Sequence, residues 1–213
     1  MRSRLPLGLM CLLATVLVQG CAPRARQSQE PAPLSSQLLA TITAQTQMSS
    51  VGARQPDVQI VEYMDYNCPY CRAMAPDLHQ LLQSDAHLQI IYKEWPILGD
   101  TSIYAARSAL AASWQGKYLT AHDALIGTTR DLDQTSDVDA VLRAAGLDLT
   151  RLAADRDRHA SQISALLARS ETETQTAGIK GTPALLVGRR LVARSVSLSQ
   201  LQSLVAEARA DHR

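Results

Sequence analysis

The chain has 213 residues and a formal net charge of only +1, and its basic residues are scattered, which argues against a nucleic-acid-binding function. Its length suits one domain with an insertion, or one domain together with targeting and linker segments. Hydrophobic residues make up 46% of the chain and phenylalanine is absent, so we expect a sizeable, largely aliphatic core.

The first twenty residues have the pattern of an export signal. Two arginines within Met1–Arg4 precede an almost wholly apolar stretch, residues 5–18, that is shorter than a typical membrane-spanning helix. The stretch ends in Leu-Val-Gln-Gly-Cys, which resembles the lipobox of bacterial lipoproteins. The resemblance implies a signal peptide over residues 1–20 and lipidation of Cys21. An ordinary signal peptide, cleaved nearby and leaving Cys21 as a free thiol, is the alternative.

This N-terminus predicts where the mature chain works. Ala22, rather than an aspartate, follows the cysteine, which in Gram-negative lipoproteins allows transfer to the outer membrane. We therefore expect a cell-envelope protein held by lipid on the periplasmic face of the membrane. Cleavage would remove Cys11 and acylation would consume Cys21, so that Cys68 and Cys71 would be the only remaining thiols. Disulfides persist in such an oxidising compartment.

The next segments are predicted to connect the anchor to a folded domain. Residues 21–34 hold three prolines and lack apolar periodicity, which is typical of an extended tether. Within residues 35–55, Leu38, Leu39 and Ile42 predict a short amphipathic helix followed by a linker. The pattern leaves open whether this helix packs on the domain or on another copy of the chain.

A buried strand and a Cys-x-x-Cys pair follow. Residues 58–64 alternate as a strand, and Glu62 falls in the same phase as the apolar residues, so its carboxylate should be desolvated and its pKa raised. Cys68 lies where the strand ends and a helix begins. We expect this position to be exposed and its thiolate to be stabilised by the amides of the first helical turn, which makes Cys68 the nucleophile. Cys71, one turn further on, should be the shielded, resolving thiol.

The remaining elements alternate between helical and strand patterns. The helix after the cysteines contains Pro76, which should kink it. A second buried strand, residues 88–95, carries Lys93 and Glu94, and residues 101–178 are helical throughout. Strand patterns return at residues 183–187 and 191–193, and a capping box at residues 197–200 opens a last helix.

Three features together resemble the thioredoxin superfamily, and in particular the DsbA-type disulfide oxidoreductases of bacterial envelopes. These are Cys-Pro-Tyr-Cys at 68–71, an acid six residues before it with a proline five residues after it, and a distant Thr182-Pro183. The resemblance covers roughly residues 56–210. It implies an α/β thioredoxin fold, a central mixed β-sheet flanked by helices, with an inserted helical subdomain. The two halves of the fold are expected at residues 56–100 and 179–213, and the insertion at residues 101–178.

The resemblance also implies roles for individual residues. Cys68 and Cys71 would form the redox disulfide, and Glu62 would correspond to the buried acid that moves protons to or from Cys71, with Lys93 as its possible charge partner. A purely structural buried acid is the alternative for Glu62. Pro183 would be the cis-proline, which would leave the Thr182 backbone free to pair with a substrate peptide. The other expected substrate-binding residues are Pro69 and Tyr70.

Other polar residues near the pair have simpler interpretations. Asp65 either tunes the thiolate or forms a turn, and His122 lies on an apolar helix face, which favours a core histidine. The histidines and cysteines lack the spacing of a structural zinc site, and no cofactor is expected.

We therefore expect thiol–disulfide exchange on exported cysteine-containing proteins, as an oxidase, isomerase or reductase, with a separate envelope redox partner that recycles the pair. In the DsbA-type oxidant a histidine usually occupies the position of Tyr70 and a valine that of Thr182. Tyr70 cannot supply the histidine's charge, so we predict a less oxidising potential than that of DsbA. Two alternatives are a copper- or zinc-binding envelope lipoprotein that uses the same cysteines and a non-catalytic thioredoxin-like interaction protein.

Overall fold

The computed structural model describes residues 34–44 and 49–211. The predicted signal peptide, the lipidation site Cys21 and the tether as far as residue 33 lie outside the described residues. Within the described part, no helix is both long enough and apolar enough to cross a membrane.

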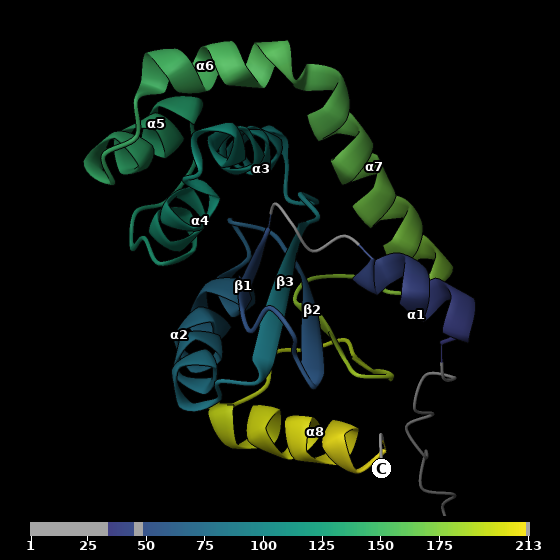
Figure 1. Ribbon diagram of the computed structural model, residues 1–213. Coiled ribbons are helices and arrows are strands. Elements are labelled where there is room, and N and C mark those ends of the chain that lie inside the picture. The colour runs from purple at the N-terminus through teal and green to yellow at the C-terminus, as the bar shows by residue number, and fades with distance from the viewer. Residues whose placement is uncertain (1–33, 45–48, 212–213) are drawn as a thin grey trace, which may run out of the picture. The chain divides into compact units, whose positions relative to one another are not determined.

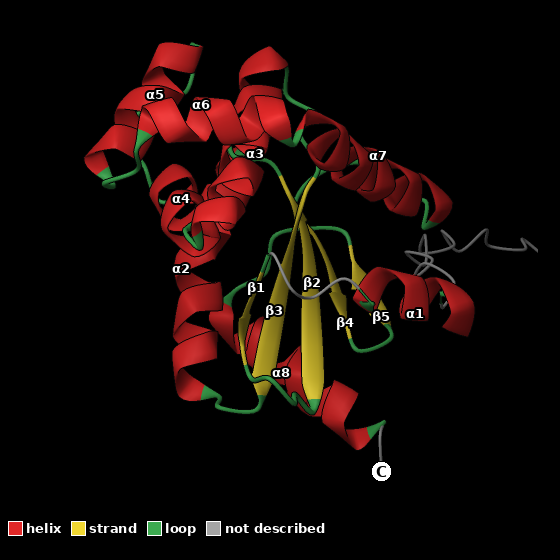
Figure 2. Cartoon of the chain, turned by 45° about the horizontal axis from the view of Figure 1, so that its top comes forward, coloured by secondary structure: helices red, strands yellow, loops and turns green. Residues whose placement is uncertain are grey.

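Five strands form one mixed sheet in the order β1-β3-β2-β4-β5; the central strands are labelled in Figure 1 and all of them in Figure 2. The central strands β2 and β3 run parallel, and every other neighbouring pair is antiparallel. The thioredoxin-type α/β fold predicted from the sequence is therefore confirmed. The strands are β1 (Ser50–Gly52), β2 (Val58–Met64), β3 (Leu88–Glu94), β4 (Ala184–Val187) and β5 (Arg190–Val192).

Helices before, between and after the strands cover the sheet, and those between β3 and β4 form the predicted helical insertion (Figure 2). The short α1 precedes the sheet, α2 connects β2 to β3, and α8 ends the described chain. The helices are α1 (Ser36–Thr43), α2 (Pro69–Ser84), α3 (Asp100–Ala112), η1 (Ser113–Gln115), α4 (Tyr118–Ile126), α5 (Thr135–Ala144), α6 (Leu149–Arg158), α7 (Ala160–Thr176) and α8 (Leu198–Ala210).

Strand alternation divides the core between the two faces of the sheet. Ile60 and Met64 of β2 belong to the larger cluster, which α2, α8 and the insertion complete. Val61 and Tyr63, one residue out of phase, belong to a smaller cluster with Leu39 and Ile42 of α1. The helix α1 therefore packs on its own domain, which decides the alternative that its sequence left open.

The helix α2 begins immediately after Cys68, and Pro69 occupies its first turn, where a missing N–H is tolerated. The helix continues through Pro76 to Ser84. At the other end of the domain, the predicted capping box of α8 is present, with Ser197 and Gln200 each bonding the other's backbone N–H. The Leu198 N–H also donates to Asp77 of α2 at 3.0 Å, which ties α8 to α2.

Candidate active site

Cys68 is the N-cap residue of α2, and Cys71 lies one turn further into the helix. Both are free thiols. The prediction that Cys68 is exposed is wrong: its exposed fraction is 3%, against 0% for Cys71. The reason is the segment 181–183, which folds over the sulfur, so that the Cys68 thiol donates a hydrogen bond to the Thr182 carbonyl oxygen at 3.3 Å.

The segment opposite Cys68 immediately precedes β4, more than a hundred residues further along the chain. The peptide bond between Thr182 and Pro183 is cis. Pro183 is buried and Thr182 is half-buried, whereas Pro69 and Tyr70 on the other side of the sulfur are exposed. The structure thus brings the four residues 68–71 together with Thr182 and Pro183.

The two thiols have opposite electrostatic environments. The hydrogen bond from the Cys71 thiol, aided by the Thr182 hydroxyl and the amides of Tyr70 and Cys71, lowers the pKa of Cys68 to about 6 against the effect of burial. The same bond to Cys68, together with burial and the negative charge of Glu62, raises the pKa of Cys71. In the reduced protein the first cysteine is therefore the one that ionises near neutral pH.

Glu62 lies on the same face of the sheet as the thiol pair. Its exposed fraction is 3%, and burial, with a smaller contribution from the Cys68 thiolate, raises its pKa to about 8. The negative charge of Glu62 in turn contributes to the raised pKa of Cys71.

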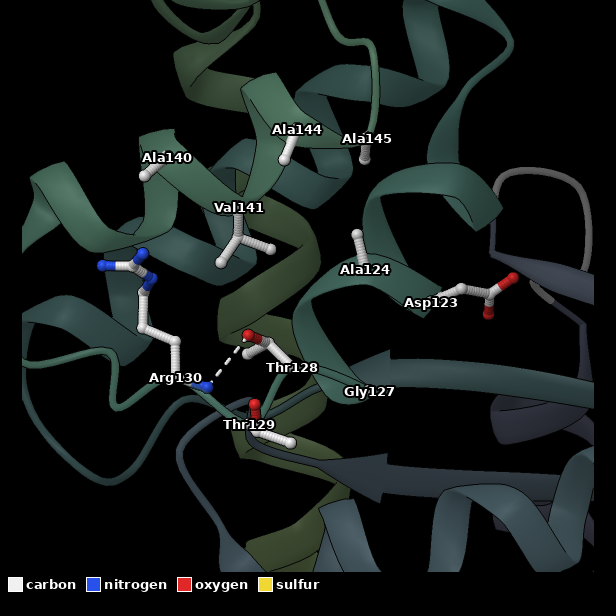
Figure 3. Close-up of a pocket in the computed structure, with 10 residues that line it drawn as sticks. All are labelled: Asp123, Ala124, Gly127, Thr128, Thr129, Arg130, Ala140, Val141, Ala144 and Ala145. Carbon is white, nitrogen blue, oxygen red and sulfur yellow. Dashed lines mark hydrogen bonds between the residues drawn. The ribbon is translucent and has the colours of Figure 1, made fainter.

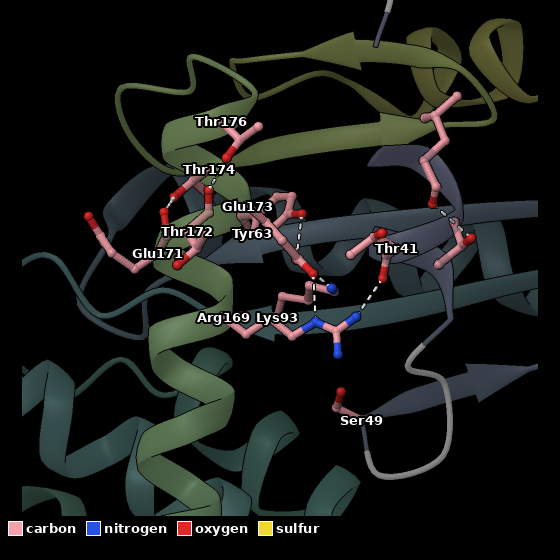
Figure 4. Close-up of polar contacts among 12 residues, drawn as sticks. Thr41, Ser49, Tyr63, Lys93, Arg169, Glu171, Thr172, Glu173, Thr174 and Thr176 are labelled. Atoms are coloured by element: carbon pink, nitrogen blue, oxygen red, sulfur yellow. Dashed lines mark hydrogen bonds and ion pairs between the residues drawn. The ribbon is translucent and has the colours of Figure 1, made fainter. Parts of the chain in front are cut away.

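Lys93 is not the charge partner of Glu62, contrary to the expectation from the sequence. In the β2–β3 register Glu62 lies opposite Tyr92, whereas Lys93 lies opposite Tyr63 and points to the other face. There Lys93 donates to Glu173 of α7 at 2.5 Å (Figure 4). The Tyr63 hydroxyl and Arg169 also donate to Glu173, at 2.9 and 3.0 Å.

The turn that leads into Cys68 is held by the side chain of one residue before the cysteine, Asp65, and one after it, Arg72. Asp65 accepts hydrogen bonds from the backbone N–H groups of Asn67, Ile97 and Leu98. It therefore forms a turn, which was one of its two predicted roles. On the other side Arg72 donates to the Tyr66 carbonyl oxygen at 2.6 Å.

The same turn is attached to the loop between α4 and α5. Asn67 donates to the Leu132 carbonyl oxygen at 3.2 Å, and Arg72 donates to that of Arg130 at the same distance. The sequence did not predict a role for Arg72 or Asn67, because the carbonyl oxygens that attach them to this loop lie about sixty residues further along the chain.

A buried polar cluster lies behind this turn. The Tyr118 hydroxyl donates to Glu94 at 2.5 Å, and the Tyr66 hydroxyl lies 3.4 Å from Glu94 and 3.1 Å from His122 Nδ1. Burial raises the pKa of Glu94 to about 7 and lowers that of His122 to about 3. His122 also stacks on Tyr92, with ring centroids 3.9 Å apart, so the prediction of a core histidine is confirmed.

Four large hydrophobic side chains in the described part of the chain are exposed to solvent. Tyr70 is 66% exposed and lies two residues after Cys68. Ile97 and Leu98 follow β3 in the loop that Asp65 holds, and Ile103 is in the first turn of α3, the turn whose Thr101 hydroxyl Asn67 contacts. We call this group the apolar rim; it comprises Tyr70, Ile97, Leu98 and Ile103.

A separate pocket of about 740 Å³ lies between α4 and α5 (Figure 3). Small apolar side chains from both helices line it, together with Gly127 to Arg130 of the connecting loop. It contains none of the predicted site residues. Among the described residues, no three histidine, cysteine, aspartate or glutamate side chains gather in a way that would hold a metal ion.

Comparisons with known proteins agree with this geometry. A family model described as DSBA-like thioredoxin domain matches residues 59–206. A thioredoxin-like oxidoreductase from Silicibacter pomeroyi DSS-3 has 38% sequence identity and a TM-score of 0.76, covering 80% of this chain and 97% of that one. The thiol-disulfide exchange protein alpha-DsbA2 from Wolbachia pipientis has 26% identity and a TM-score of 0.75, covering 81% and 92%.

Curated relatives match only through part of their length. The Na(+)/H(+) antiporter NhaA 1 of Salinispora arenicola is 30% identical over 161 residues, which are 74% of this chain and 24% of the antiporter. The chain spans less than a quarter of the length of the curated relatives that it matches.

Proposed function

The chain belongs to the DsbA-like thioredoxin domain family, and we propose that it catalyses thiol–disulfide exchange on exported cysteine-containing proteins. The observation that carries this proposal is the difference between the two thiols: the pKa of Cys68 is lowered to about 6, whereas that of Cys71 is raised. At neutral pH the reduced pair then contains one thiolate and one thiol. Exchange needs this combination of an attacking and a resolving group.

The reaction follows in two steps. The Cys68 thiolate attacks one sulfur of a substrate disulfide, forming a mixed disulfide, and the other substrate sulfur leaves as a thiolate that takes up a proton. Cys71 then loses its proton and attacks the Cys68 sulfur, which releases the second substrate thiolate and leaves Cys68 and Cys71 joined as a disulfide. Two electrons pass from the pair to the substrate, and the reverse sequence oxidises a substrate dithiol. A separate envelope redox partner would restore the pair after each cycle.

Glu62 is the group that accepts the Cys71 proton in this proposal. Its raised pKa, about 8, leaves Glu62 mostly protonated at pH 7, and its ionised fraction takes up the Cys71 proton and later returns it. Transfer to Glu62 neutralises the charge that raises the pKa of Cys71, so that Cys71 becomes a better nucleophile when it has to act.

Thr182, Pro69 and Tyr70 are proposed to contact the substrate. The Thr182 backbone lies against the Cys68 sulfur, where an extended peptide can pair with it as an added strand. Pro69 and Tyr70 are exposed beside the sulfur, and Tyr70 belongs to the apolar rim. Exposed apolar side chains around a reactive thiol favour a polypeptide substrate over a small thiol.

We further propose that residues 1–20 are a lipoprotein signal peptide, that Cys21 is lipidated, and that residues 21–34 tether the domain to the periplasmic face of a membrane, with the outer membrane favoured by Ala22. Two or more acyl chains hold a protein on a bilayer far more firmly than one. Expression of the full chain in a Gram-negative bacterium tests this: wild type should sediment with outer membranes and Cys21→Ser should be released. Equal sedimentation of both would contradict lipidation.

Trapping tests the exchange reaction directly. Cys71→Ala removes the resolving thiol, so mixed disulfides with envelope proteins should accumulate on Cys68 and disappear on reduction. The matched control is Cys68→Ala/Cys71→Ala, which should trap nothing. If Cys71→Ala traps no protein, or if a phenotype of the chain survives Cys68→Ser, the proposed function fails and a non-catalytic role is favoured.

A further inference from the structure

Asp65 joins two segments of the chain, and the proposed thiol–disulfide exchange does not require this connection. Its Oδ1 accepts a hydrogen bond from the Asn67 N–H at 2.8 Å, and its backbone carbonyl accepts one from the Cys68 N–H at 3.0 Å. Its Oδ2 accepts from the N–H groups of Ile97 and Leu98 at 2.8 and 2.9 Å. One buried side chain thus fastens the loop after β3 to the turn that carries Cys68.

The fastened loop presents apolar side chains to water. Ile97 and Leu98 are 40% and 49% exposed, while their N–H groups point inward to Asp65. Ile97 and Leu98 are two of the four large hydrophobic residues that are exposed in the described part of the chain, and Tyr70, two residues after Cys68, is another. Exposed apolar groups gathered at one place mark a contact surface. Because Asp65 fastens Ile97 and Leu98 to the turn that carries Cys68, the occupant that fits this surface is the polypeptide whose cysteine reacts there.

We propose that Asp65 is a positioning residue for protein substrates. It holds Ile97 and Leu98 beside Cys68, where they bind apolar side chains that flank the reacting cysteine of a partly unfolded polypeptide. The inference rests on the proposed function. It predicts a dependence on substrate size, because a small dithiol has no flanking side chains and its reaction involves the thiol pair alone.

The most informative variant is Asp65→Ser. A serine hydroxyl still bonds the N–H two residues further on, so the turn before Cys68 is kept, but it is too short to reach the N–H groups of Ile97 and Leu98. The oxidised protein is mixed with reduced, unfolded ribonuclease A and, separately, with dithiothreitol, and both rates are measured. We expect the ribonuclease rate to fall about five- to tenfold, which corresponds to about 1 to 1.4 kcal/mol. The dithiothreitol rate should change by less than about twofold.

Two further variants make the test specific. Asp77→Asn is the matched control, because Asp77 also accepts a backbone N–H from another element, at 3.0 Å, but between α2 and α8. It should leave the ratio of the two rates unchanged. Ile97→Ser/Leu98→Ser should reduce the ribonuclease rate by the same factor as Asp65→Ser, and combining all three substitutions should cause no further loss.

Each result decides the inference. An unchanged ratio in Asp65→Ser overturns it, and an equal fall of both rates also overturns it, because Asp65 would then act on the thiol pair. If Asp65→Ser does not fold, as judged by circular dichroism, Asp65→Asn keeps one acceptor and should show a smaller fall in the same ratio. If wild type reacts with neither reagent, the proposed function itself fails.

Discussion

The reactivity of Cys68 depends on the few hydrogen-bond donors that face its sulfur atom. One of them is the Thr182 hydroxyl, which contributes to the lowering of the Cys68 pKa to about 6. In Thr182→Val the shape is kept and this donor is lost. We expect the pKa of Cys68 to rise by about one unit, since a hydrogen bond to a charged group contributes about 1.5 kcal/mol. Ultraviolet absorbance of the thiolate as a function of pH measures this, and Thr182→Ser, which keeps the hydroxyl, should behave as wild type.

Glu62 should make the stability of the domain depend on pH. Its folded-state pKa, about 8, is above the ordinary value of 4.5, so the folded protein holds a proton that the unfolded chain releases. The favourable contribution is fully present below about pH 4.5 and is lost as the pH rises through about 8. At about 1.36 kcal/mol per unit, the total is of order 5 kcal/mol.

Glu62→Gln isolates this contribution. In the reduced protein Cys68 has the opposite effect: its lowered pKa gives stability that is present above its unfolded pKa and is lost as the pH falls through about 6. Urea unfolding of wild type and Glu62→Gln should therefore be compared pairwise at each pH between about 5 and 9. The variant should gain stability relative to wild type as the pH rises. If the difference in free energy of unfolding between the two proteins did not change with pH, Glu62 would not have the raised pKa proposed for it.

The position of a residue can be predicted from the sequence where its determinants are local. The strand phase placed Glu62 on the face of the thiol pair, and the start of a helix located Cys68. Prediction fails where a contact depends on a distant segment. The burial of Cys68 comes from Thr182, and the partner of Lys93 is Glu173, eighty residues further on. No local pattern contains these pairings.

At the scale of elements, the buried ion pair between Lys93 and Glu173 joins β3 to α7. Burial lowers the pKa of Lys93, and Glu173 opposes that effect. We expect Glu173→Met to reduce the free energy of unfolding by about 3–5 kcal/mol, because it leaves the lysine charge buried without a partner. Urea denaturation measures the loss.

The double variant Lys93→Met/Glu173→Met is the control for this prediction. Removing both charges should restore part of the stability, the part that comes from the unpaired lysine charge. The Tyr63 hydroxyl and Arg169 lose Glu173 in both variants, so that loss remains. The Cys68 pKa should stay near 6 in both variants, because the pair lies on the opposite face of the sheet. Equal stability of the single and double variants would contradict the argument.

The order of elements was also largely predictable. Helical periodicity identified the insertion, and the capping box located the start of α8. The sequence does not predict strand β1, because three residues are too few to show alternation. Only the pairing with β3 identifies this segment as a strand. Ile103 lies in the predicted helical region, yet it is 40% exposed as part of the apolar rim. Periodicity finds apolar residues but does not separate those of a core from those of a contact surface.

At the scale of the whole molecule, the lowered Cys68 pKa sets how oxidising the disulfide form is. A thiolate stabilises the reduced protein, and each pKa unit below the ambient pH is equivalent to about 30 mV for a two-electron couple. DsbA, with a thiolate pKa of about 3.5, has a potential of about −120 mV. A pKa of about 6 removes about 70 mV of that stabilisation at pH 7. We therefore expect a potential of about −190 mV.

Equilibration of the purified protein with glutathione buffers of known ratio, followed by mass spectrometry of the reduced fraction, measures this potential. Thr182→Val supplies an internal control, because raising the Cys68 pKa from about 6 to about 7 should make the potential about 20 mV more negative at pH 7. A wild-type value near −120 mV would contradict the prediction. It would mean that something other than the thiolate of Cys68 destabilises the disulfide, and it would favour a strong oxidase. A value near −190 mV, shifted as expected in the variant, would favour an isomerase or reductase. A thiol pair at that potential is a weaker oxidant of its substrates than the pair of DsbA.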